Sequence, residues 1–179
     1  MRILVTGATG YVGAHFVKVA AEAGHTIVAT DYNLEQNDLK KYCAKIVEWD
    51  IRKPISNKIV GVDKVVHIAA RTKVPNSVKD PYDYYLTNVV GTKNVIDAAP
   101  CNHFVYCSTG SAFNPASNPY AGSKHAGELV AKQFNDKWPD QAPLQCSQWY
   151  KQTYPVFLTL RENLPPVHFL LEICVATLT

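Results

Sequence analysis

The chain has 179 residues, of which 47% are hydrophobic and 18% charged, so it can bury the core of one ordinary domain. Its formal charge of +3 comes from scattered residues without a Lys/Arg tract, which argues against nucleic-acid binding. The five cysteines show no Cys-x-x-Cys spacing, so neither a zinc site nor a disulfide framework is indicated. No stretch has the pattern of a signal peptide or a membrane span, and we expect a cytoplasmic protein.

The first predicted elements are a buried strand, a glycine-rich turn and a helix. Residues 2–6 form a predicted strand around the apolar run Ile3-Leu4-Val5, and residues 11–23 carry apolar side chains at helical spacing before Gly24. A dinucleotide pyrophosphate needs such a turn, because the backbone must approach the phosphates and the helix start offers free N–H groups. The residues expected at the pyrophosphate are Gly7, Gly10, Tyr11, Val12 and Gly13.

The second predicted strand, residues 26–30, ends at Asp31. This residue follows Gly13 by 18 positions, close to where a carboxylate meets the adenosine ribose. A carboxylate there accepts hydrogen bonds from both ribose hydroxyls and repels a 2′-phosphate. Because neither Tyr32 nor Asn33 supplies a cation for that phosphate, the cofactor expected is NAD.

Later elements continue the alternation of strands and helices. Strands are predicted over residues 45–49, 64–68 and 103–107, with a helix over 82–98. This order predicts an α/β fold, a doubly wound parallel sheet in three layers. After the fifth strand, Tyr120 and Lys124 stand four apart, so a helix would place both on one face. A neighbouring ammonium favours the phenolate, which makes Tyr120 a candidate acid and base.

The order of these motifs resembles the NAD-dependent epimerase/dehydratase family, an extended branch of the short-chain dehydrogenases/reductases, and its UDP-glucose 4-epimerases in particular. The resemblance is carried by Gly-x-x-Gly-x-x-Gly over 7–13, by residues 67–94 with their paired tyrosines and Asn88-Val-Val-Gly-Thr, and by Tyr120-Ala-Gly-Ser-Lys124. It implies a Rossmann-type NAD domain followed by a smaller substrate domain.

The resemblance also implies roles for individual residues. It places Asp50 and Ile51 at the adenine, and Arg71 near the pyrophosphate. Asn88 would tie a loop backbone near the nicotinamide side. Thr72, with Lys73 beside it, stands where these epimerases carry a cofactor-contacting lysine. The remaining residues expected at the cofactor are Ala69, Ala70, Ser108, Tyr120 and Lys124, and those expected in catalysis are Thr109, Tyr120 and Lys124.

The implied reaction is epimerisation of a nucleotide sugar, with a UDP-sugar as the expected substrate, through a 4-keto sugar. The sister reaction, 4,6-dehydration, uses an acidic pair directly after the catalytic Ser/Thr. Because Gly110 and Ser111 follow Thr109 here, dehydration is disfavoured. The sequence leaves open whether the chain forms a homodimer.

The resemblance covers residues 1–132, the expected NAD-binding domain, and fades over residues 133–179. In that divergent tail, residues 156–161 are a candidate strand, and most of the family's substrate domain has no counterpart. Two alternatives therefore stand beside the epimerase. One is a truncated module that binds NAD without catalysis, and the other is a reductase of a keto sugar or small carbonyl that uses the same Tyr120/Lys124 pair.

Overall fold

A computed structural model describes residues 1–34, 38–101 and 103–135 of the chain. In this part a single parallel sheet has the strand order β3-β2-β1-β4-β5. The doubly wound, Rossmann-type sheet predicted from the sequence is thus confirmed, with strand ends that differ by up to two residues. The strands are β1 (Arg2–Thr6), β2 (Thr26–Asp31), β3 (Cys43–Glu48), β4 (Lys64–His67) and β5 (His103–Tyr106).

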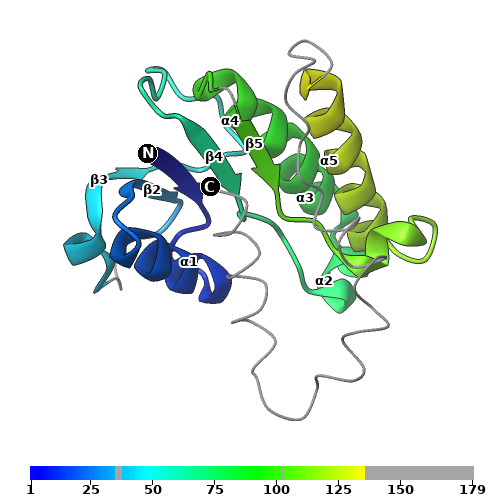
Figure 1. Cartoon of the computed structure of the whole chain (residues 1–179). Helices are drawn as coiled ribbons and strands as arrows, with labels where there is room; N and C mark the ends of the chain where they lie inside the picture. The colour runs from blue at the N-terminus through cyan, green and yellow to red at the C-terminus, as the bar shows by residue number, and fades with distance from the viewer. Residues whose placement is uncertain (35–37, 102, 136–179) are drawn as a thin grey trace, which may run out of the picture.

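Helices cover both faces of the sheet, with α1 on one side and α3, α4 and α5 on the other (Figure 1). The α-helices are α1 (Tyr11–Glu22), α2 (Val74–Lys79), α3 (Pro81–Tyr85), α4 (Gly91–Ala98) and α5 (Pro119–Asn135). Two short 3₁₀ helices, η1 (Asp38–Tyr42) and η3 (Gly110–Phe113), and one π-helical turn, η2 (Leu86–Val90), complete the set.

Alternate residues of β1 enter two separate cores. Ile3 and Val5 pack on the α1 side with Phe16, whereas Leu4 packs on the other side with Val95 of α4. All five side chains are fully buried. A parallel strand covered on both faces reads as a continuous apolar run, which explains the sequence Ile-Leu-Val.

From β1 the chain adds β2 and β3 on one side of the sheet and then β4 and β5 on the other side. This change of direction is where ligands bind in such sheets. β1 pairs with β2 on one side and with β4 on the other, with Thr6 in register with both Thr30 and His67. At such a switch point the connections leave the carboxyl ends of neighbouring strands in opposite directions, which opens a crevice above them. The loops after β1, β2, β3 and β4 therefore surround one site.

The helix predicted over residues 82–98 is built from three consecutive segments, α3, η2 and α4. The π-helical turn in the middle holds Asn88, and such turns frequently occur at functional sites. Gly91 allows this region to pack closely on the loop after β3, because a Cβ there would lie 2.8 Å from Ile51 Cδ1.

Helix α5 continues to Asn135, beyond the domain boundary expected at residue 132. The rest of the divergent tail, including the candidate strand at 156–161, lies outside the described residues. None of the helices in the described part combines the length and apolar character that crossing a membrane requires.

Candidate cofactor cleft and catalytic helix

The glycine turn between β1 and α1 has no room for side chains at two of its glycines. Gly7 has a φ of +68°, and a Cβ on it would lie 2.7 Å from the Ala69 backbone nitrogen. A Cβ on Gly13 would overlap the carbonyl of Gly7 and lie 2.9 Å from Ala8 Cα. Gly10 caps α1 without a side-chain hydrogen bond, so the first N–H groups of that helix remain available to an anion.

A cleft of about 450 Å³ lies above this turn, at the switch point of the sheet. Its volume is in the range of small-molecule and cofactor sites. The loops after four strands bring eleven of the residues expected at the cofactor to its wall. These are Gly7, Gly10, Tyr11, Val12, Gly13, Asp31, Asp50, Ile51, Ala69, Ala70 and Arg71.

Asp31 is held at the edge of the cleft by Thr9, a residue that the sequence did not single out. Its Oδ2 accepts hydrogen bonds from the Thr9 backbone N–H at 3.0 Å and from the Thr9 hydroxyl at 2.7 Å. Its Oδ1 accepts from the Tyr32 backbone N–H at 2.8 Å. The carboxylate expected at the adenosine ribose is therefore oriented by the glycine turn itself.

The Asp50 carboxylate, expected at the adenine, is already paired with an arginine. Arg52 Nη2 lies 2.7 Å from Asp50 Oδ2, and Arg52 Nε donates to Asp50 Oδ1 at 2.9 Å. These hydrogen bonds lower the pKa of Asp50. The apolar wall beside it consists of Ile51 and of Trp49, which is 6% exposed and donates from Nε1 to the Lys53 carbonyl. Trp49 and Arg52 were both missed by sequence reasoning.

Two consecutive residues of the π-helical turn, Thr87 and Asn88, have different surroundings. Asn88 is buried, with its Oδ1 accepting from the Arg71 backbone N–H at 2.8 Å and its Nδ2 donating to the Arg71 carbonyl at 3.1 Å. Nδ2 also donates to Ser123 Oγ of α5 at 2.9 Å. This is the loop contact expected of Asn88, while its contact with a nicotinamide stays a prediction.

Thr87, in contrast, lines the cleft, as Asn88 does not. Thr87 Oγ1 is buried and has no hydrogen-bond partner among the described residues. A buried hydroxyl without a hydrogen-bond partner lowers the stability of the fold. Its position on the cleft wall suits a ligand that would form a hydrogen bond with it. The sequence gave no signal that separates Thr87 from its neighbour.

The expected catalytic pair lies on α5. Tyr120 is half-buried, and its ring meets the ring of Tyr84 edge-on, with 6.4 Å between centroids. Lys124 is 3% exposed, and its Nζ donates to the Cys107 carbonyl at 2.6 Å and lies 4.2 Å from the centre of the Tyr106 ring. Neither residue is among those that line the cleft.

The strand end opposite α5 carries the two expected hydroxyls. Thr109 caps η3, and its Oγ1 accepts from the Ser111 backbone N–H at 3.3 Å. The Ser108 hydroxyl donates to the buried carboxylate of Glu128, a residue of α5 that the sequence did not indicate. Neither hydroxyl lines the cleft either, so the structure groups Ser108 with α5 instead of with the glycine turn.

A buried histidine of β4 links β1 to α4. His67 Nδ1 lies 2.6 Å from the Thr6 hydroxyl and Nε2 lies 3.0 Å from the Thr92 hydroxyl. Because Thr92 donates its own hydrogen to the Asn88 carbonyl, Nε2 is the protonated nitrogen and Nδ1 accepts from Thr6. Burial, and then the charge of Lys124, lower the pKa of His67 to about 3.

These features suit a dinucleotide. The glycine cradle, the oriented Asp31 and the unpaired Thr87 hydroxyl surround one elongated cleft at the switch point. The family model described as the NAD dependent epimerase/dehydratase family matches residues 3–150. The chain belongs to this family. The predictions of the family and of NAD as its cofactor are thereby confirmed.

Relatives within the family include both epimerases and dehydratases. A dTDP-glucose 4,6-dehydratase of Mycolicibacterium smegmatis is 30% identical over 84% of this chain and 54% of its own length. A UDP-glucose 4-epimerase of Corynebacterium glutamicum is 32% identical over 63% of this chain and 36% of its own. The structure of a UDP-Glc/GlcNAc 4-epimerase from Campylobacter jejuni is 26% identical with a TM-score of 0.67, covering 80% of this chain and 52% of that one. The chain spans about half the length of such relatives or less.

Proposed function

We propose that the chain binds NAD and inverts the configuration at C4 of a nucleotide sugar, with a UDP-sugar as substrate. The observation that carries this proposal is one continuous set of contacts. Asn88 bonds to the loop that lines the cleft and, through Ser123, to the helix that bears Tyr120 and Lys124. These hydrogen bonds connect the cleft to the helix that carries the proposed acid–base pair.

In this proposal NAD supplies the hydride acceptor and donor, and the residues of the chain position the sugar and move its proton. Tyr120 accepts the proton of the C4 hydroxyl as a ketone forms at C4, and returns it after the keto sugar has turned over. Thr109 holds that hydroxyl. The ammonium of Lys124, oriented by the Cys107 carbonyl, stabilises the negative phenolate of Tyr120.

Epimerisation is favoured over 4,6-dehydration by the residues that follow Thr109. Dehydration requires an acid that works on neighbouring carbons, and η3 continues with Gly110 and Ser111. The buried carboxylate found close to this strand end, Glu128, is bonded to the Ser108 hydroxyl. This hydrogen bond gives Glu128 a structural partner within the fold.

A second candidate is a module that binds NAD without turnover. The observation that favours it is that Thr109, Tyr120 and Lys124 are not among the described residues that line the cleft. A reductase of a keto sugar would use the same tyrosine and lysine and differs only in consuming the cofactor.

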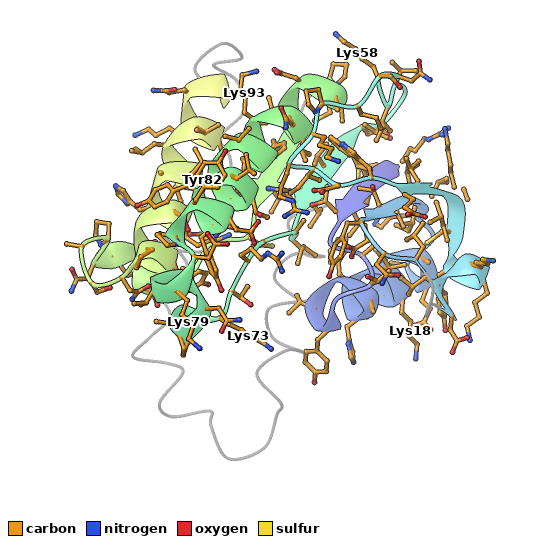
Figure 2. The ribbon with its side chains drawn as sticks, turned by 180° about the vertical axis from the view of Figure 1, so that it is seen from behind. Lys18, Lys58, Lys73, Lys79, Tyr82 and Lys93 are labelled. Atoms are coloured by element: carbon orange, nitrogen blue, oxygen red, sulfur yellow. The ribbon has the colours of Figure 1, made fainter. Side chains whose placement is uncertain are left out.

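One assay separates these functions. The chain is incubated with UDP-glucose or UDP-galactose, with and without added NAD, while inversion at C4 and NADH absorbance are followed. We expect inversion without net change in NADH, and a loss of about 100-fold or more in Tyr120→Phe at unchanged NAD affinity. The control is Tyr82→Phe, at a position of α3 that is 73% exposed on the outer surface of the helices (Figure 2).

Each other outcome points elsewhere. Net oxidation of NADH with a keto sugar would identify a reductase. NAD binding without turnover of any UDP-sugar would identify the binding module. Full turnover in Tyr120→Phe would remove this residue from the chemistry.

A further inference from the structure

We infer that Asp83 is a positioning residue that holds the Arg71 guanidinium at the cleft, where Arg71 binds the pyrophosphate of the dinucleotide. This inference rests on the proposed binding of NAD. Asp83 lies on α3 and is not among the residues that line the cleft, so its effect on a ligand acts through its partners.

The charges on the cleft wall leave one cation for an anionic ligand. Among the described residues that line it, Asp31 and Asp50 are acidic and Arg52 and Arg71 are basic. Arg52 is committed to Asp50, because Nε and Nη2 both bond to that carboxylate. Arg71 has no such acidic partner on the wall and is the cation that can face a phosphate.

The main chain of Arg71 is fixed close to the glycine turn. Ala69, two residues earlier on the same loop, has its backbone nitrogen against Gly7. The N–H and the carbonyl of Arg71 are both bonded to Asn88. The side chain therefore starts from a defined point beside the turn expected to hold the pyrophosphate.

Asp83 fixes the other end of this side chain. Its Oδ2 lies 2.6 Å from Arg71 Nε, and its Oδ1 accepts from Arg52 Nη1 at 2.8 Å. The carboxylate is itself held at the start of α3, where the Asp83 backbone N–H donates to Asp80 Oδ1. The ion pair engages Nε, and a guanidinium carries four further N–H donors on its terminal nitrogens.

Such an arrangement prepares Arg71 for an anion. The side chain of Asp83 is 20% exposed and that of Arg71 is 46% exposed, so the anchor is sheltered while the cation is accessible. A side chain that is already ordered loses less conformational entropy when a ligand binds, which raises affinity. Because Asp83 also holds Arg52, the same carboxylate connects the adenine loop to the pyrophosphate side.

The test is a double-mutant cycle on NAD binding by the full chain, measured by calorimetry. We expect Arg71→Gln and Asp83→Asn each to weaken NAD binding about 5- to 10-fold, and the double variant to be no weaker than Arg71→Gln alone. The slope of log Kd against log salt should fall in Arg71→Gln, because that variant loses the charged contact with the phosphate. Asp83→Glu, which keeps the carboxylate, should stay within about 2-fold of wild type.

The matched control is Asp97→Asn, which breaks the exposed pair of Asp97 with Lys93 on α4 and should leave NAD affinity unchanged. Losses that multiply in the double variant, or an unchanged affinity in Asp83→Asn, would overturn the inference. If Asp83→Asn does not fold, the NAD affinity of Arg71→Gln is the test, because Arg71 is more exposed. An unchanged NAD affinity in Arg71→Gln would also overturn the inference. Wild-type chain that binds no NAD would instead refute the proposed function.

Discussion

The cofactor cleft and the catalytic helix are built in different ways. The cleft is formed by loops that follow four consecutive strands, and its shape depends on backbone that only glycine permits at Gly7 and Gly13. The proposed catalytic helix α5 is positioned by hydrogen bonds to distant parts of the chain. Lys124 bonds to the Cys107 carbonyl, and Ser123 bonds to Asn88.

The two regions also differ in whether their polar groups already have hydrogen-bond partners. The cleft keeps a buried Thr87 hydroxyl that finds no hydrogen-bond partner in the described part of the chain, which suits a binding surface. On the catalytic side, by contrast, Ser108, Thr109 and Lys124 already bond to groups of the protein. In the proposed function, dinucleotide binding is thus a property of the cleft, whereas catalysis requires a substrate to engage α5. Four changes to the chain test this division.

The largest effect is expected from Gly13→Ala, which acts on the cleft alone. Its Cβ would overlap the Gly7 carbonyl, so the turn must open, and NAD affinity should fall about 100-fold or more with loss of stability. The control is Gly24→Ala, where φ is +85° but the added Cβ would meet no atom within 4 Å beyond its chain neighbours. It should cost about 1 kcal/mol in free energy of unfolding and leave NAD binding intact. Wild-type affinity in Gly13→Ala, measured by calorimetry, would break the comparison.

A second test concerns His67, the buried histidine that bonds to Thr6 of β1 and Thr92 of α4. Its pKa is about 3 in the fold against 6.5 for the ordinary side chain, so the unfolded chain binds more protons between these values. The stability that the fold gains by holding His67 neutral is fully present above pH 6.5 and is lost as the pH falls towards 3. Over this window the free energy of unfolding should drop by up to about 1.4 kcal/mol for each pH unit.

Denaturant titrations at several pH values measure this slope. In His67→Gln the slope should be shallower by that amount, although the variant is less stable throughout because Thr6 and Thr92 lose a partner. An identical slope in the two proteins would show that His67 is not held neutral.

A third test removes the carboxylate at the edge of the cleft. Asp31→Ala should weaken NAD binding about 10-fold and narrow the preference for NAD over NADP, because the ribose hydroxyls lose an acceptor and a 2′-phosphate is no longer repelled. Thr9→Val should have a smaller effect, since the Thr9 backbone N–H still donates to Asp31. Calorimetry with both cofactors measures the preference. An unchanged ratio in Asp31→Ala would place the ribose elsewhere.

The smallest effect is expected from Thr87→Val, and its two parts have opposite signs. The change removes a buried hydroxyl that has no partner in the described residues, so stability should rise by about 1 kcal/mol. NAD affinity should fall a few-fold, because a ligand loses its hydrogen bond. Thermal unfolding and calorimetry on the same samples give both values. A fall in stability would mean that the hydroxyl is paired within the protein.

Much of the fold was predictable because its signals are local. The strand over residues 2–6 and the start of the helix at Tyr11 agree with the structure, since an apolar run followed by closely spaced glycines has few other solutions. Asp31 was found by its distance from Gly13, and the structure places it on the cleft wall. The spacing of glycines and of a single carboxylate is a property of neighbouring residues.

The parts that could not be predicted depend on packing between distant segments. Thr9 contacts Asp31 across 22 residues, and Arg52 contacts Asp83 across 31. Glu128 is buried against Ser108, although glutamate side chains usually face solvent. No periodicity in the sequence reports which polar residue finds a partner in the fold.

The position of Trp49 has a practical consequence. Its indole forms part of the cleft wall, is almost fully buried and is tied to the Lys53 carbonyl. Indole emission responds to the polarity and motion around the ring, so this side chain is an intrinsic fluorescent reporter of what enters the cleft. The chain has three tryptophans, and replacing Trp138 and Trp149 by phenylalanine would leave an optical signal that comes from the cleft alone.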